Sequence, residues 1–232
     1  MASIKITATD GSGMFAAHVV EPKTKPAGVV VLIQEIFGVN QAMRDIAAWV
    51  ADLGFIAVAP DLFWRIEPGI DITDKSDAEW KRAFELFQTF DQIKGIEDLK
   101  ATVTACRTLS GASGKVATVG YCLGGRLAFM MAQQSDADAN ISYYGVGLDG
   151  LLGDLPKVTK PLLIHIADKD AFFPPEGRAA VVAATQGHKY AISHVYPNAD
   201  HAFARVNGTH WDGRSATIAN GRSAELLAAT LG

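Results

Sequence analysis

Residues 115–126 of the chain read Lys-Val-Ala-Thr-Val-Gly-Tyr-Cys-Leu-Gly-Gly-Arg, an apolar run followed by a glycine-rich turn. The apolar run predicts a strand, and the residues after the turn predict a helix. Cys122 stands at the centre of the turn, with Gly120 and Gly124 on either side. A reversal this sharp strains the backbone of its central residue, and larger side chains at the two glycine positions would collide. The stretch therefore predicts a strand–turn–helix corner that lifts the Cys122 thiol to the end of a strand.

This predicted corner gives Cys122 a different chemistry from Cys106. The first amides of a helix favour a thiolate, and the N–H of Leu123 would face a developing oxyanion. Cys106 falls on the face of a predicted helix and is interpreted as a small buried hydrophobe. The Gly-x-Cys-x-Gly pattern is that of a nucleophile elbow with cysteine in the usual serine position, so Cys122 is the candidate nucleophile.

The rest of the chain alternates apolar runs with helical periodicity, which is typical of an α/β fold with a mostly parallel sheet and helices on both faces. An opening hairpin is expected at 4–9 and 14–20. Further strands are predicted at 29–33, 55–59, 115–119, 140–144, 161–167 and 190–196. Helices are predicted at 42–53, 78–90, 96–109, 124–133, 175–185 and 213–231, and residues 64–79 are expected to form a loop. No linker divides the chain, so residues 1–232 are expected to form a single domain.

Composition and charge exclude several other classes of protein. The chain holds 21 basic and 25 acidic side chains, a formal net charge of −4, and the basic residues are scattered. A nucleic-acid partner is therefore not expected. No apolar run approaches the roughly 18 residues that a membrane span needs, so no membrane partner is expected either. Two cysteines and the lack of a secretory pattern at residues 1–5 suit a cytoplasmic protein.

A nucleophile at such a corner needs an acid and then a histidine further along the chain. Asp168 and Asp170 follow the strand predicted at 161–167, and His201 follows the strand predicted at 190–196. Because α/β sheets place ligands at the carboxyl ends of their strands, we expect these side chains to meet Cys122. Asp200 is a rival orienter of the histidine, but adjacent residues on a loop rarely face each other.

No metal or organic cofactor is expected. The chain has no His-Glu-x-x-His, no Cys-x-x-Cys and no dense aspartate cluster. Residues 145–150 match a dinucleotide fingerprint, but residues 151–160 contain a glycine and a proline and are expected to form a loop rather than the required helix. His165 falls in the middle of a predicted strand and is interpreted as a hydrogen-bonded core residue. The remaining histidines other than His201 are interpreted as surface residues; they are His18, His188, His194 and His210.

Three stretches form a family pattern: Gln-Glu-Ile-Phe-Gly-Val-Asn at 34–40, Ala-Pro-Asp-Leu at 59–62 and Gly-Tyr-Cys-Leu-Gly-Gly at 120–125. On these stretches, and along nearly its whole length, the chain resembles the dienelactone hydrolase (carboxymethylenebutenolidase) family of α/β-hydrolases. Tyr-Tyr-Gly at 143–145 and His-Ala-Phe-Ala-Arg at 201–205 also match. The resemblance implies an α/β-hydrolase fold and a cysteine-dependent hydrolase that opens enol lactones or related carboxylic esters without a cofactor.

The resemblance also implies catalytic roles for the matching residues. Cys122 matches the nucleophile, His201 the base, and Asp170, in preference to Asp168, the acid that orients the histidine. The backbone N–H groups of Ile36 and Leu123 match the family's oxyanion hole.

Two further matching residues concern activation of the thiol. Glu35 matches a carboxylate that holds the resting thiol neutral and swings in to take its proton when substrate arrives. Arg205 matches an arginine that receives the displaced carboxylate and helps bind a carboxylate of the substrate. A thiol that is deprotonated on demand is protected from oxidation. The alternative interpretation of Glu35 is an ordinary loop carboxylate paired with Arg205.

One position departs from the family's pattern. The second substrate-binding arginine of the best-known members falls at Trp80 here, with Lys81 and Arg82 beside it. Either a neighbouring cation takes over, or the pocket accepts a less anionic, more apolar substrate. Phe37 and Tyr144 are additional candidates for substrate contact. Three hypotheses stay open: a dienelactone hydrolase-like enzyme, a small carboxylesterase, or a non-catalytic ligand-binding relative. We expect a monomer whose partner is a small lactone or ester.

Overall fold

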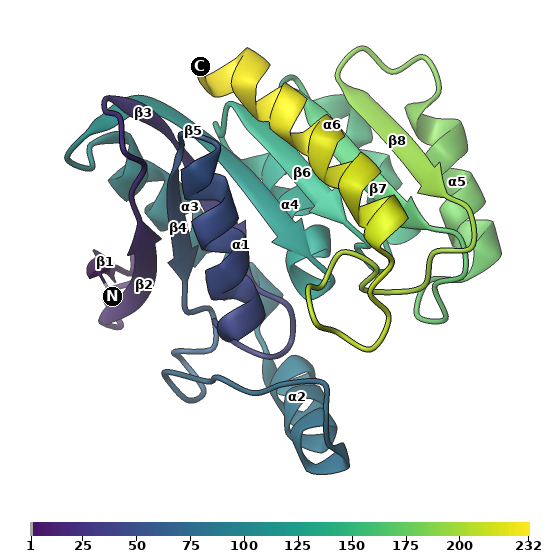
Figure 1. The fold of residues 1–232 in the computed structure, drawn as a ribbon, viewed down its shortest axis with the longest axis horizontal. Coiled ribbons are helices and arrows are strands. Elements are labelled where there is room, and N and C mark those ends of the chain that lie inside the picture. The colour runs from purple at the N-terminus through teal and green to yellow at the C-terminus, as the bar shows by residue number, and fades with distance from the viewer. Residues whose placement is uncertain (1) are drawn as a thin grey trace.

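The apolar runs form one eight-stranded sheet in the computed structural model, which describes residues 2–232 (Figure 1). The strand order is β1-β2-β4-β3-β5-β6-β7-β8. Strand β2 pairs antiparallel with β1 and β4, and all other pairs are parallel, as the sequence predicts. The strands are β1 (Ala2–Thr7), β2 (Met14–Val20), β3 (Ala27–Ile33), β4 (Ile56–Pro60), β5 (Ala112–Tyr121), β6 (Ala139–Tyr143), β7 (Leu162–Ala167) and β8 (Ala191–Tyr196).

Strand β3 shows why the sheet carries helices on both faces. Its residues are all buried, and alternate side chains enter different clusters. Val31 packs with residues of α3 and α4, whereas Leu32 packs with residues of α1 and α6, the two helices in front of the sheet in Figure 1. The helices are α1 (Gln41–Asp52), α2 (Asp77–Thr89), α3 (Gln92–Arg107), α4 (Leu123–Gln134), α5 (Pro175–Thr185) and α6 (Gly213–Leu231).

The structure corrects two of the predicted elements. The helix predicted at 96–109 begins earlier, at Gln92, because the Asp91 carboxylate caps it by accepting hydrogen bonds from the N–H groups of Ile93 and Lys94. The loop predicted at 151–160 is wrong in part, since Asp149–Lys157 forms a 3-10 helix that tolerates Pro156. This short helix is not the α-helix that a dinucleotide-binding crossover requires.

The sheet gathers the candidate residues at one edge. Parallel strands β3, β5, β7 and β8 all end on the same side, and their following loops carry Glu35, Cys122, Asp170 and His201. His165, by contrast, lies inside β7, fully buried, with its ring nitrogens 2.8 Å from the Tyr196 hydroxyl and 2.9 Å from Ser223 Oγ. The prediction of a hydrogen-bonded core histidine is confirmed. Among residues 2–232, no helix has both the length and the apolar character needed to cross a membrane.

Candidate active site

The corner at the end of β5 has the strained backbone that its glycines predict. Cys122 has a φ of 55° and a ψ of −113°, a region that non-glycine residues rarely occupy. A Cβ atom on Gly120 would lie 1.8 Å from the Gly124 carbonyl oxygen, and one on Gly124 would lie 2.1 Å from the Ile33 carbonyl oxygen. Only glycine fits at either position. The corner therefore presents the half-buried Cys122 side chain at the beginning of α4.

His201 and Asp170 meet across the loops that follow β8 and β7. His201 Nδ1 lies 2.7 Å from Asp170 Oδ2, and both side chains are almost fully buried. Asp170 Oδ1 accepts a hydrogen bond from the Phe172 N–H at 2.9 Å, which fixes the orientation of the carboxylate. Burial alone would lower the pKa of His201. The charge of Cys122 and the hydrogen bonds to Asp170 and Cys122 outweigh burial and raise this pKa to about 10.

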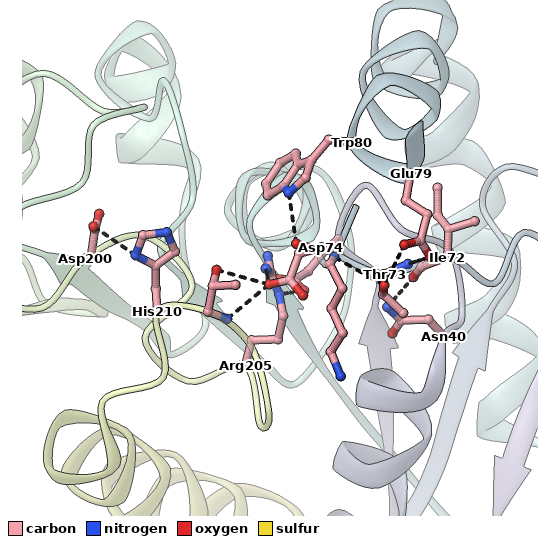
Figure 2. Close-up of polar contacts among 12 residues, drawn as sticks. Asn40, Ile72, Thr73, Asp74, Glu79, Trp80, Asp200, Arg205 and His210 are labelled. Carbon is pink, nitrogen blue, oxygen red and sulfur yellow. Dashed lines mark hydrogen bonds and ion pairs between the residues drawn. The ribbon is translucent and has the colours of Figure 1, made fainter. Parts of the chain in front are cut away.

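The two rival carboxylates lie elsewhere. Asp168 is exposed to solvent. Asp200 accepts a hydrogen bond from the backbone N–H of His201 at 2.7 Å and lies 3.0 Å from the exposed ring of His210, a contact drawn in Figure 2. Neither carboxylate contacts the imidazole of His201, so Asp170 is the carboxylate that can hold this ring in one tautomer.

Arg205 is bound by two carboxylates. Its Nε and Nη2 atoms donate hydrogen bonds to the two Glu35 oxygens at 2.6 and 2.9 Å, and its Nη1 donates to Asp74 Oδ2 at 2.7 Å. All three side chains are almost fully buried. Glu35 is therefore engaged with Arg205 in this structure, a contact that both interpretations of Glu35 include. Since two carboxylates face one guanidinium, the cluster has a net charge of about −1 when all three groups are ionised.

Asp74 also attaches the segment before α2 to the rest of the site (Figure 2). Its Oδ2 accepts a hydrogen bond from the Thr209 N–H at 3.2 Å, and its backbone carbonyl accepts one from Trp80 Nε1 at 3.0 Å. Asp74 was not predicted from the sequence, because a single aspartate in a polar stretch belongs to no motif. Its contact with Arg205 joins residues 131 positions apart.

A cavity of about 310 Å³ opens in front of Cys122. One face of α2 supplies an aromatic wall of Trp80, Phe84 and Phe87, which follow helical spacing. The Phe37 ring packs edge-on against Trp80 with centroids 5.1 Å apart. Residues that line the cavity are Ile36, Phe37, Trp80, Phe84, Phe87, Gln92, Cys122, Leu123, Arg126, Val146, Gly147, Phe172, His201 and Arg205. Five of these residues were not predicted from the sequence: Phe84, Phe87, Gln92, Arg126 and Phe172.

Three candidate substrate-contacting residues lie away from this cavity wall. Lys81 is exposed, and Arg82 forms ion pairs with Glu67 and Glu85. Both follow Trp80 on α2 and therefore point to other sides of the helix. Tyr144 is buried behind the site, with its ring centroid 5.3 Å from that of His201. The structure thus brings Trp80 and Phe37 to the cavity but neither neighbouring cation.

The two residues of the expected oxyanion hole lie at the same cavity. Ile36 and Leu123 both line it. Leu123 is the first residue of α4, so its N–H has no partner within the helix. The structure shows no hydrogen bond from the Ile36 N–H to any of residues 2–232. In the same part of the chain, no group of three or more His, Cys, Asp or Glu side chains could hold a metal ion.

Comparisons with known proteins agree in pointing to one family. The model of the dienelactone hydrolase family matches residues 15–231. The chain is 51% identical over 234 residues to a protein of Azospirillum brasilense provisionally named carboxymethylenebutenolidase, and the match covers 100% of both chains. It is 39% identical over 225 residues to carboxymethylenebutenolidase 1 of Cupriavidus pinatubonensis, which covers 97% of this chain and 95% of the relative.

A solved structure agrees with these sequence matches. The crystal structure of a provisionally named dienelactone hydrolase from Klebsiella pneumoniae superposes with a TM-score of 0.80 at 26% identity. The superposition covers 98% of this chain and 99% of that one. Both the sequence and the arrangement of its elements are therefore similar to those of dienelactone hydrolases along essentially the whole chain.

Proposed function

The chain belongs to the dienelactone hydrolase family and has its α/β-hydrolase fold, and on this premise we propose that it opens lactones or activated carboxylic esters with Cys122 as nucleophile. Membership of this family identifies the chain as a hydrolase. The observation that supports the finer proposal is that Cys122 and His201 line the same cavity, while the buried Asp170 carboxylate lies 2.7 Å from Nδ1 of His201.

In the proposed first step, the Cys122 thiolate attacks the carbonyl carbon of the ester. The N–H groups of Ile36 and Leu123 stabilise the oxyanion that forms. When the carbonyl re-forms, the bond to the leaving oxygen breaks and a thioester to Cys122 remains. The leaving enolate or alkoxide then takes up the proton that left the thiol, so no net proton is gained or lost in this step. Because a thiolate is a better leaving group than an ordinary alkoxide, activated esters such as enol lactones should react best.

In the second step, Cys122 is an uncharged thioester and no longer raises the pKa of His201, so His201 can remove a proton from a water molecule that attacks the thioester. The carbon–sulfur bond breaks, which releases a carboxylic acid and restores Cys122. Asp170 accepts the hydrogen bond from His201 Nδ1 and stabilises the imidazolium that forms. In this scheme Asp170 keeps Nε2 of the imidazole available for the water.

Glu35 is the proposed proton acceptor for the thiol before attack. Its two oxygens now accept hydrogen bonds from Arg205, so it must leave Arg205 in order to reach the thiol. Asp74 would remain on Arg205 after this movement and would keep the buried guanidinium paired. A cluster with two carboxylates can therefore release one of them without leaving a buried charge alone.

A small carboxylesterase with a less anionic substrate is the second candidate function. The aromatic wall of Trp80, Phe84 and Phe87 favours it, because this wall supplies apolar surface where the family's second arginine would stand. Esters with an apolar acyl group would then be hydrolysed at least as well as anionic lactones. A panel that contains both kinds of substrate separates the two candidates.

Replacement of Cys122 tests the proposed function directly. We expect Cys122→Ala to abolish hydrolysis of activated esters and dienelactones, while Cys122→Ser retains only hydrolysis of the simplest activated esters. Cys106→Ala is the matched control, because Cys106 is fully buried and its burial raises the thiol pKa to about 12. Full activity in Cys122→Ala would overturn the assignment.

Alkylation distinguishes an enzyme from a non-catalytic ligand-binding relative. Iodoacetamide should modify Cys122 alone, and substrate-like lactones should slow the reaction. Absence of thiol reactivity, together with no turnover of any activated ester, would favour the binding protein.

A further inference from the structure

Arg126 is the charged group of the cavity that the proposed mechanism leaves unused. It lies in the first turn of α4, four positions after Cys122, and it lines the same cavity. Residues at this spacing are neighbours on one face of a helix. The side chain is half-buried. The Arg126 guanidinium and the Cys122 thiol therefore belong to the lining of one cavity.

The protein holds this guanidinium with neutral acceptors alone. Arg126 Nε donates to Gln92 Oε1 at 2.9 Å, and Nη1 donates to the carbonyl oxygens of Val146 and Gly147. Within the described part of the chain, no carboxylate lies within 4.0 Å of Arg126, and Nη2 makes no hydrogen bond. Burial lowers the pKa of Arg126, opposed only by the more remote charge of Asp149.

Arg205, the other arginine of the cavity, has charged partners instead. It donates three hydrogen bonds to two buried carboxylates, so its charge is more than balanced. An anionic group that enters the cavity meets a net negative cluster at Arg205 and an uncompensated positive charge at Arg126. The electrostatics of the cavity therefore favour an anion beside Arg126.

The position of Arg126 is unfavourable for the helix itself. A cation in the first turn of a helix faces the positive end of the helix dipole, which is unfavourable. The contacts with Gln92, Val146 and Gly147 nevertheless hold the guanidinium in one place and leave one of its nitrogens free. A guanidinium that is held in place with Nη2 unbonded is well suited to bind a carboxylate.

We propose that Arg126 binds a carboxylate of the substrate through Nη2 and so selects esters and lactones whose anionic group can reach Arg126 within the cavity. The proposal rests on the proposed function, since it places the substrate carbonyl at Cys122. Arg126 supplies the positive charge from α4, and the aromatic wall of α2 then contacts the apolar part of the same substrate.

The test compares two esters that differ only in charge. The mono-4-nitrophenyl ester of adipic acid carries a carboxylate, and its methyl ester is the neutral counterpart. In Arg126→Met, we expect kcat/KM for the anionic ester to fall about 10- to 100-fold, the loss typical of one charge-assisted hydrogen bond. The value for the neutral ester should stay within about threefold of the wild type. Arg126→Lys, which keeps the charge, should recover part of the activity on the anionic ester.

Arg214→Met is the matched control. Arg214 also lies in the first turn of a helix, α6, but it is exposed and does not line the cavity. This variant should treat both esters like the wild type. If Arg126→Met lowers kcat/KM for both esters by the same factor, Arg126 only supports the loop at 146–147, and the proposal is wrong.

Alkylation of Cys122 supplies a readout that does not depend on ester turnover. Iodoacetate carries a carboxylate, whereas iodoacetamide is its neutral counterpart. The ratio of their rates at Cys122, followed by peptide mass, should fall at least about fivefold in Arg126→Met. If the wild type hydrolyses neither ester, the proposed function fails while this ratio still tests Arg126. An unchanged ratio would overturn the role of Arg126 as an anion-binding residue.

Discussion

Replacement of Asp74 by asparagine changes the charge of the Arg205 cluster with almost no change of shape. Asp74 Oδ2 accepts hydrogen bonds from Arg205 Nη1 at 2.7 Å and from the N–H and hydroxyl of Thr209 at 3.2 and 3.4 Å. The amide oxygen of asparagine can accept the same bonds but carries no charge. Glu35 remains bound to Arg205 through both its oxygens. The substitution therefore removes one of two charges that face a buried cation.

The contacts set the size of the expected effect. A hydrogen bond to a charged group contributes about 1.5–3 kcal/mol, against about 0.5–1.5 kcal/mol for a neutral one. We therefore expect Asp74→Asn to lower the free energy of unfolding by about 1–2 kcal/mol. This is less than the roughly 3–5 kcal/mol lost when a buried ion loses its only partner, because Glu35 still pairs with Arg205. For a chain of this size, Tm should fall by about 2–8 °C.

The same substitution should affect catalysis. With Asp74 neutral, Arg205 attracts Glu35 more strongly, and departure of Glu35 toward the thiol becomes harder. A loss of about 1–2 kcal/mol in this step corresponds to a fall of roughly 5- to 30-fold in kcat/KM. If Glu35 is only a structural partner of Arg205, kcat/KM should remain near the wild-type value.

The effect on stability should also depend on pH. Burial opposes ionisation of Asp74, but the hydrogen bond to Arg205 and the charge of Arg205 lower its pKa overall. A carboxylate with a lowered pKa in the folded state stabilises the protein above its unfolded pKa of about 4, and this stabilisation is lost as the pH falls through the folded value. The difference between wild type and Asp74→Asn should therefore be largest near pH 7 and should shrink below about pH 4.

Urea unfolding at pH 7 and pH 3.5, with steady-state kinetics on one activated ester, measures these effects. Asp71→Asn is the matched control, because Asp71 lies on the same segment and pairs with Arg44 at 2.8 Å at an exposed site. It should change stability by less than about 1 kcal/mol. Equal stability of wild type and Asp74→Asn at pH 7, or a difference that grows on acidification, would refute the reasoning.

Two other predictions concern His201 and Tyr144. In Cys122→Ser, we expect the pKa of His201 to fall from about 10, because the charge of Cys122 and its hydrogen bond help to raise it against the effect of burial. A raised histidine pKa stabilises the fold below about pH 6.5, and this stabilisation is lost as the pH rises toward 10. The variant should therefore lose less stability than the wild type between about pH 6.5 and pH 10. NMR titration of the imidazole gives the pKa, and a value still near 10 would contradict the coupling between His201 and Cys122. Tyr144→Phe removes a buried hydroxyl that has no hydrogen-bond partner within residues 2–232, so the free energy of unfolding should stay equal or rise by up to about 2 kcal/mol. A loss above about 1 kcal/mol in urea unfolding would show that the hydroxyl is paired.

Much of the candidate site follows from short stretches of the sequence. The corner at Cys122 depends on steric limits between residues at most four positions apart, together with one neighbouring strand, so glycine spacing predicts it. Asp170 and His201 each follow a predicted strand, and parallel strands end at one edge of a sheet. Their order in the sequence therefore predicts that their loops lie at the same edge as Cys122. Helical spacing could also have shown that Trp80 shares a face of α2 with Phe84 and not with Lys81.

Other features were decided by the tertiary structure alone. The contact between Asp74 and Arg205 joins two loops that are 131 positions apart, and nothing local in either loop specifies the partner. The uncompensated charge of Arg126 depends on which side chains and carbonyl groups the folded chain brings around it. The physical reason is the range of the interactions. Steric exclusion and hydrophobic periodicity act between near neighbours and leave a mark in the sequence, whereas the pairing of buried charges depends on distances that only the packed chain defines.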